Sequence, residues 1–113
     1  MIANSDTIYI LPNDNISEVG IDDKERLYVK PEKQTFEYIW RAAAEVGWDA
    51  KEHILFSPKP REWSYLDWYK HIIAIAKDEY GCALLLTQLT KWTNISDDLK
   101  YQIDLYAKVE QRL

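Results

Sequence analysis

The residues best suited to chemistry lie in two short segments, each of which combines basic side chains with a tryptophan. One segment spans residues 57–63 and the other spans residues 87–94. Each follows an expected strand. If the two strands are parallel, both segments emerge at the carboxyl edge of the sheet beside helix N-termini, where open sheets bind ligands. The bases would then hold an anion and the indole rings would stack on it. The candidate ligand-binding residues are Lys59, Arg61, Glu62, Trp63, Thr87, Lys91, Trp92 and Asn94.

A structural role explains the same residues, and it is the interpretation that we favour. Trp63 precedes an expected helix start at Ser64 and can pack on Trp68 as a hydrophobic staple. Trp92 can cover the core, and the bases can be solvated loop charges. Glu62 can act as a general acid or base in a tryptophan-lined pocket, or it can belong to a surface ion pair.

The other chemistry-bearing side chains stand apart from one another in the sequence. His71 lies in the polar stripe of an expected helix, and His53 opens an expected strand. For both we favour a structural role, with the first solvated and the second hydrogen-bonded. Cys82 has no neighbour in the sequence that would lower its pKa, so we interpret it as a small core residue. The chain carries no glycine-rich phosphate loop, nucleophile elbow, zinc-protease motif or EF-hand. We therefore assign no catalytic residue, metal or cofactor, and we lean against an enzyme.

The negative charge of the protein is concentrated near its N-terminus. Six of the 19 acids and one of the 14 bases lie in residues 1–25, so this segment accounts for the whole net charge of −5. A neutral body without a basic stripe argues against nucleic-acid binding. Turn-forming residues predict that residues 13–25 form an acidic loop that can face a basic partner. The candidate partner-binding residues are Asp14, Glu18, Asp22 and Asp23.

The length and composition predict one domain that covers residues 1–113. Apolar runs that end at proline or turn residues indicate strands, and apolar residues at helical spacing indicate helices. The leucines around residue 85 also fit a helical face, but Gly81 stops the preceding helix and we favour a strand. The order β-β-α-β-α-β-α predicts an α/β or α+β fold with a single small sheet of about four strands and three helices. The expected strands cover residues 7–11, 26–30, 53–57 and 83–87, and the expected helices cover residues 32–46, 64–80 and the chain from Ser96 onward.

The expected helix over residues 64–80 has an apolar arc that is wider than one sheet face usually covers. Its polar residues form a single narrow stripe. The helix therefore either lies at the centre of the fold or contributes to a subunit interface. The candidate interface residues are Tyr65, Trp68, Tyr69 and Ile72.

Two further features indicate the compartment. No apolar stretch approaches the roughly 20 residues that a membrane span requires, and the N-terminus lacks the layout of a signal peptide. Cys82 is the single cysteine, which excludes an intramolecular disulfide. We expect a cytoplasmic protein with no membrane partner.

The spacing of residues 53–95 resembles that of small bacterial proteins encoded by the mobile gene cassettes of integrons. The pattern is Ser-Pro-x-Pro-x-Glu-Trp from Ser57, then Glu-Tyr-Gly from Glu79, then Leu-Thr-x-x-Thr-x-Trp-x-Asn from Leu86. The resemblance implies bacterial origin, small size and oligomerisation. It implies no activity and assigns no catalytic residue.

Taken together, these features predict a non-enzymatic interaction module that forms a homo-oligomer or binds another protein through an acidic and aromatic surface. An immunity or antitoxin protein that blocks a basic toxin is a specific version of this hypothesis. The alternative is a small-molecule or anion-binding domain, or an enzyme, that uses the two tryptophan-bearing segments.

Overall fold

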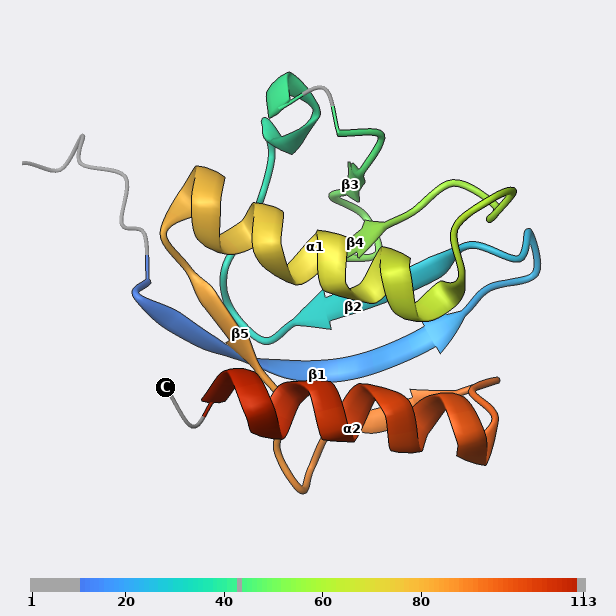
Figure 1. Ribbon diagram of the computed structural model, residues 1–113. Coiled ribbons are helices and arrows are strands. Elements are labelled where there is room, and N and C mark those ends of the chain that lie inside the picture. Colours follow the sequence, from blue (N-terminus) through green and yellow to red (C-terminus); the bar gives the residue numbers. More distant parts are fainter. Residues whose placement is uncertain (1–10, 43, 112–113) are drawn as a thin grey trace, which may run out of the picture.

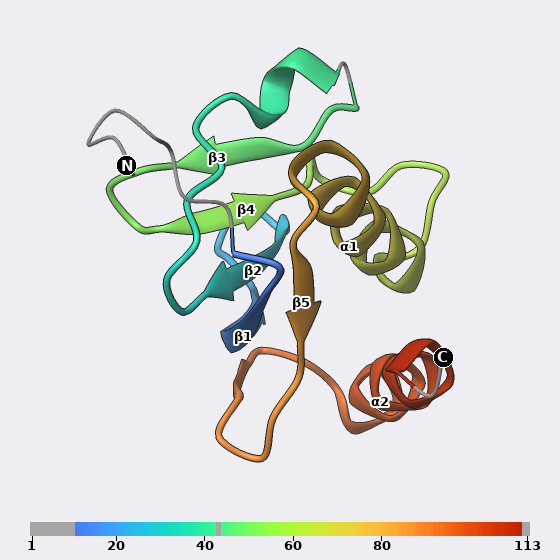
Figure 2. The ribbon, with the colours of Figure 1, turned by 90° about the vertical axis from the view of Figure 1, so that its left-hand side faces the viewer.

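The computed structural model describes residues 11–42 and 44–111 and shows one mixed sheet with two α-helices on the same side of it (Figure 1). Viewed from the side, α1 and α2 lie together on one face of the strands (Figure 2). The coarse prediction of a single sheet with helices is therefore confirmed. The expected four strands and three helices are wrong in detail, because the described residues form six strands, two α-helices and one short 3-10 helix.

The long strand β1 organises the sheet. The strand order is β3-β4-β2-β1, and β5 and β6 both pair with β1 in parallel. β5 lies beside the first residues of β1 and β6 lies beside its later residues. The strands span Asn13–Ile21 (β1), Leu27–Pro31 (β2), Gly47–Asp49 (β3), Ile54–Phe56 (β4), Ala83–Leu85 (β5) and Lys91–Thr93 (β6).

Helix α1, Tyr65–Tyr80, begins and ends where the sequence predicts. The Ser64 hydroxyl accepts a hydrogen bond from the Asp67 backbone N–H, and the Asp67 carboxylate accepts one from the Ser64 N–H, which completes a capping box. The rings of Trp63 and Trp68 lie 4.7 Å apart, as expected of the staple. Gly81 closes the helix with a left-handed backbone (φ 68°).

The wide apolar arc of α1 is covered by the chain itself. The helix contacts β2, β5, the 3-10 helix η1 (Ile39–Ala42) and α2 (Asp97–Gln111). Trp68, Tyr69 and Ile72 are buried, and Tyr65 is half-buried. The central position that we considered therefore explains the arc. The four residues predicted at a subunit interface therefore pack against the protein's own core. The three buried ones are not accessible to a second subunit.

The predicted acidic loop over residues 13–25 is mostly strand. Asn13–Ile21 is β1, and only the residues after it form a turn. A β-bulge between Ile16 and Glu18 shifts the pairing with β2, so that the buried residues Ile16 and Val19 are three positions apart. This spacing hides the alternation by which a strand is recognised in a sequence.

The helix predicted over residues 32–46 is also wrong. The only helix in the segment is η1, whose first residue Ile39 is buried, and Phe36 reaches the core from irregular backbone. Side chains from distant elements satisfy part of this backbone; for example, the Tyr80 hydroxyl accepts a hydrogen bond from the Tyr38 N–H at 3.0 Å. The aromatic and β-branched residues of this segment have a weak preference for helix. Tertiary hydrogen bonds therefore take the place of those that the expected helix would have made.

The remaining predictions agree with the structure where it describes them. Strands expected at 26–30, 53–57 and 83–87 are present as β2, β4 and β5, and the last expected helix is α2. The strand expected at 7–11 lies outside the described residues except for Leu11, which is not in a strand. β3 and β6 were not predicted, because three residues are too few to show a period. Among the described residues no helix is long and apolar enough to cross a membrane.

Candidate functional site

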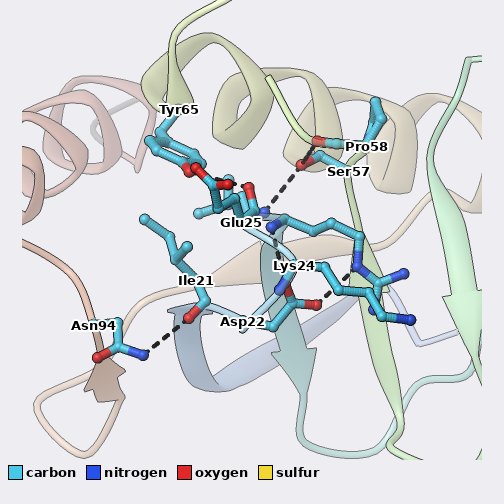
Figure 3. Close-up of polar contacts among 10 residues, drawn as sticks. Ile21, Asp22, Lys24, Glu25, Ser57, Pro58, Tyr65 and Asn94 are labelled. Carbon is cyan, nitrogen blue, oxygen red and sulfur yellow. Dashed lines mark hydrogen bonds and ion pairs between the residues drawn. The ribbon is translucent and has the colours of Figure 1, made fainter. Parts of the chain in front are cut away.

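The turn between β1 and β2 is built around one carboxylate. The Asp22 side chain accepts hydrogen bonds from the backbone N–H groups of Lys24 and Arg26, both at 2.9 Å, and pairs with the Arg26 guanidinium at 2.8 Å (Figure 3). Partial burial raises the pKa of Asp22, but the bonds from Arg26 and Lys24 outweigh burial and lower the pKa below its usual value. This carboxylate therefore stays charged and holds the turn in shape.

Residues from two distant elements form hydrogen bonds with the backbone of the β1–β2 turn. The Tyr65 hydroxyl, at the start of α1, donates to the Glu25 carbonyl at 3.0 Å (Figure 3). The Asn94 side-chain amide, just after β6, donates to the Ile21 carbonyl at 3.2 Å. The turn is thus anchored to the helical layer and to the sheet, which reduces the freedom that it would lose on binding a partner.

A second polar network lies on the sheet face that is turned away from the helices. Leu27 and Val29 of β2 are buried, so Tyr28 between them points to the other face. One oxygen of Glu18 accepts hydrogen bonds from the hydroxyls of Tyr28 and Thr93, both at 2.6 Å. The network therefore joins β1, β2 and β6.

Burial and hydrogen bonding shift the pKa values of Glu18 and Tyr28 in this network. Partial burial raises the pKa of Glu18, but the bonds from Thr93 and Tyr28, with help from Lys91 and Lys30, outweigh burial and lower the pKa. Burial and the Glu18 carboxylate raise the pKa of Tyr28 to about 12. At neutral pH, Glu18 is therefore an anion and Tyr28 a neutral hydrogen-bond donor.

These two networks border a hollow of about 430 Å³, which we call the acidic hollow. It lies between the β1–β2 turn, the β3–β4 turn and the end of β6. Five acids line it, against two bases, and one of the bases, Arg26, is already paired with an acid. The acids are Glu18, Asp22, Asp23, Asp49 and Glu52, and the bases are Arg26 and Lys30.

Three of the four predicted partner-binding acids line this hollow, and the fourth does not. Asp14 is only 5% exposed. Its carboxylate accepts hydrogen bonds from the backbone N–H groups of Asn15 (3.0 Å), Lys33 (2.8 Å) and Gln34 (2.8 Å). Asp14 therefore holds the segment after β2 against β1 and does not face a partner. Asp49 and Glu52 were not predicted, because they belong to a segment far along the chain whose net charge is only −1, with Lys51 between the two acids.

The first tryptophan-bearing segment lines a separate hollow of about 520 Å³, which we call the tryptophan hollow. Lys59, Arg61, Glu62 and Trp63 all border it. Its bases have acidic neighbours, since the Lys59 ammonium pairs with Glu25 at 2.9 Å and the Arg61 guanidinium lies 3.8 Å from the Glu45 carboxylate. The hollow is thus nearly balanced in charge.

The second segment does not reach the tryptophan hollow. Lys91 and Trp92 lie in β6, and Thr87 and Trp92 line a third hollow, of about 440 Å³, beside α2. Asn94 lines the acidic hollow. The eight residues predicted to bind one ligand are therefore distributed over three hollows and the surface between them, and the tryptophan and third hollows have no residue in common.

The two histidines and the cysteine have structural surroundings. His71 is half-buried, its Nε2 lies 3.1 Å from the Ala44 carbonyl, and its ring packs edge-on against both Trp63 and Trp68. It is therefore less solvated than we predicted. His53 packs edge-on against Trp48, but its buried Nε2 has no hydrogen-bond partner among the described residues, contrary to the hydrogen-bonded histidine that we predicted. Burial raises the pKa of the Cys82 thiol to about 11, which suits a core residue and opposes a nucleophile.

Within residues 11–42 and 44–111, no group of three or more histidine, cysteine or carboxylate side chains could hold a metal ion. The fold and the site thus define a small α+β domain whose distinctive surface is an acidic hollow on the sheet side. Comparison with known proteins gives the family.

The chain belongs to the family of the integron cassette protein Hfx_Cass5, whose sequence profile matches residues 14–90. A solved structure of an integron cassette protein Hfx_Cass5, from the mobile metagenome of the North West Arm sewage outfall, is 36% identical to this chain. The match covers 82% of this chain and 93% of that chain, with a TM-score of 0.40. No curated protein matches the sequence. The predicted resemblance to integron cassette proteins is confirmed.

Proposed function

We propose that the protein is a non-enzymatic binding module that takes a positively charged segment of another protein in the acidic hollow. One observation supports this most directly: the hollow carries five acids and two bases, whereas the tryptophan hollow carries two of each. A concave surface lined by one sign of charge concentrates the field and attracts a partner of the opposite sign.

The architecture of the hollow supports a protein partner over other ligands. A nucleic acid would be repelled by the same charges. A lysine or arginine side chain could pair with the exposed carboxylates of Asp23 and Glu52 while its apolar stem lies against Tyr28 or Ile54. Because the β1–β2 turn is already anchored by Tyr65 and Asn94, little ordering free energy is lost on binding.

An immunity or antitoxin role is the form of this function that a preformed acidic surface serves best. Such a protein must find a basic partner quickly, and long-range attraction raises the association rate. The alternative use of the two tryptophan-bearing segments as one anion site has less support. Lys59 and Arg61 lie beside Glu25 and Glu45, and the two segments border different hollows.

The proposal can be tested with a fluorescently labelled oligolysine peptide as the probe. Asp23 and Glu52 are exposed at the rim of the hollow. The double variant Asp23→Asn/Glu52→Gln should bind the peptide about fivefold to tenfold more weakly in fluorescence anisotropy at low salt, since each of the two lost contacts between exposed charges removes about 0.5–0.7 kcal/mol. The difference should shrink at about 0.15 M ionic strength, where exposed charges are screened.

The matched control is Glu32→Gln/Asp78→Asn, which removes the same charge from exposed positions outside the hollows described above. Its affinity for the peptide should stay close to that of the unmodified protein. If both double variants weaken binding equally, only the net charge matters and the hollow is not the site. If neither variant changes the affinity, the proposal is wrong.

A further inference from the structure

Helices α1 and α2 and strand β5 border a fourth hollow, of about 330 Å³, which we call the tyrosine hollow. β5 runs from the end of α1 toward α2, so the three elements meet along this strand (Figure 2). Most of the residues that line the hollow are apolar or aromatic, and they include Tyr69, Ile73, Leu84, Leu85 and Tyr106. The tyrosine hollow shares no residue with the acidic hollow.

The charges at the rim of the tyrosine hollow are balanced. Lys77 and Glu110 are its only charged lining residues, and both are exposed. One charge of each sign gives no net attraction for an anion or a cation. The hollow therefore suits an uncharged molecule, in contrast to the acidic hollow.

The Tyr69 hydroxyl is a polar group without a partner in this apolar surrounding. The Tyr69 side chain is only 1% exposed, yet its hydroxyl forms no hydrogen bond with any described residue. The unpartnered polar atoms that are wholly enclosed belong to Trp48, His53 and Trp68, so the oxygen of Tyr69 is not among them. The small exposed part of Tyr69 therefore includes the hydroxyl, which is accessible from the hollow that Tyr69 lines.

A hydroxyl in this position has the chemistry of a ligand contact. Buried polar groups are nearly always hydrogen-bonded, and leaving one without a partner is unfavourable. Ligand pockets are mostly apolar and contain a few polar groups that fix the orientation of the ligand. Burial, with smaller effects of Tyr106 and Asp104, raises the pKa of Tyr69 well above its usual value, so the hydroxyl stays protonated and can donate to an acceptor.

We propose that the tyrosine hollow binds a small, uncharged, mostly apolar molecule whose single oxygen acceptor takes a hydrogen bond from the Tyr69 hydroxyl. The volume of about 330 Å³ lies at the lower end of the range for ligand pockets, so the molecule is smaller than most drugs. Ile73, Leu84 and Leu85 contact its apolar part. The Tyr106 ring, edge-on to Tyr69 with the ring centres 6.1 Å apart, forms an aromatic wall.

This site goes beyond the proposed function, because it uses another surface and another kind of ligand. None of the eight residues predicted from the sequence to bind a ligand lines the tyrosine hollow. A molecule of this size makes few contacts, so we expect dissociation constants on the order of millimolar for simple probes.

Two probes of similar shape test the proposal. Acetophenone carries a carbonyl acceptor, and ethylbenzene has no acceptor. Titration of the unmodified protein with either probe should shift the amide NMR signals of residues 69–77, 83–85 and 106–110. In Tyr69→Phe, acetophenone should bind about fivefold more weakly, as expected for the loss of one hydrogen bond, whereas the affinity for ethylbenzene should stay the same.

The stability of Tyr69→Phe gives an independent result. Because the substitution removes an oxygen that bonds no described residue, the midpoint of urea denaturation should stay close to that of the unmodified protein. The matched control is Tyr101→Phe, which removes a hydroxyl from an exposed position on α2 outside the hollow and should change the affinity for neither probe.

Three results would overturn the proposal. The first is that neither probe shifts the amide signals around the tyrosine hollow. The second is that Tyr69→Phe leaves the affinity for acetophenone unchanged or weakens both probes equally, since the hydroxyl would then not bond the acceptor. The third is a clear fall in the urea midpoint of Tyr69→Phe, which would show that the hydroxyl already has a partner within the fold.

Discussion

At the scale of single residues, the structure separates acids that the sequence presents as one group. Asp14 and Asp23 both lie in the acidic N-terminal segment, yet Asp14 is buried and accepts three backbone hydrogen bonds, whereas Asp23 is exposed at the rim of the acidic hollow. The first stabilises the fold, and the second is available to a partner.

This difference gives a prediction for Asp14→Ala. The variant leaves the buried N–H of Gln34 and its neighbours without their acceptor, so we expect the free energy of unfolding to fall by about 3 kcal/mol. Urea denaturation measures this loss. At a temperature where the variant is folded, its affinity for the oligolysine probe should be unchanged.

Asp23→Asn is the comparison, and it should give the reverse result. Its free energy of unfolding should change by less than about 0.5 kcal/mol, as for most exposed positions, while probe binding weakens. Loss of probe binding in folded Asp14→Ala, or a large loss of stability in Asp23→Asn, would contradict these assignments.

At the scale of elements, the bulged strand β1 determines the site. The bulge puts Ile16 and Val19 on the core side and frees Glu18 to bond Tyr28 and Thr93 on the other face. Farther along the strand, Gly20 pairs with Tyr28 in the sheet, and the Tyr28 ring lies where a Cβ of residue 20 would stand. A glycine is therefore required at this position.

We predict that Gly20→Ala destabilises the protein by about 2 kcal/mol, because the added methyl group displaces the Tyr28 ring and weakens its bond to Glu18. Chemical denaturation of a double-mutant cycle checks the cause. In a Tyr28→Ser background, which has no ring, Gly20→Ala should cost at least about 1 kcal/mol less. Equal costs in the two backgrounds would show that the Tyr28 ring is not the obstacle.

The elements also show what the sequence can and cannot predict. Helix α1 was predictable to the residue, because local signals, namely the Ser64 cap, the tryptophan staple and Gly81, define both of its ends. Strand β1 was not predicted for two reasons. A bulge interrupts its alternation of buried and exposed residues, and the burial of Asp14 depends on hydrogen bonds that form only in the folded chain. The prediction of a helix at residues 32–46 was wrong for a similar reason. Contacts between distant residues, such as that of Tyr38 with Tyr80, determine the backbone conformation of this segment.

At the scale of the whole molecule, the helices and the charge lie on different sides. α1 and α2 cover one face of the sheet (Figure 1). The acidic hollow lies at the end where β1 turns into β2, and its lining includes Tyr28, whose side chain points to the other face. The sequence located three of the hollow's acids through local charge, but Asp49 and Glu52 join them only because β3 and β4 fold back beside β2. A site whose residues come from turns far apart in the sequence cannot be predicted from the local density of charge in the sequence.

The same reasoning explains the wide apolar arc of α1. The apolar arc of α1 is wide because four elements pack around it. Helix α2, by contrast, leaves the side chains of Tyr101, Leu105 and Val109 exposed. Hydrophobicity in the sequence measures the total apolar surface of a helix, and only the fold decides which part is left for a partner.

The central claim, that the acidic hollow binds a basic segment, is tested most directly by mapping the oligolysine probe on the protein through amide chemical shifts in NMR. The account predicts that the largest shifts fall on the β1–β2 turn around Asp23, on the β3–β4 turn around Glu52 and on Asn94, and that they saturate together. Shifts spread evenly over the acidic surface, or centred on the tryptophan hollow around Trp63, would contradict it.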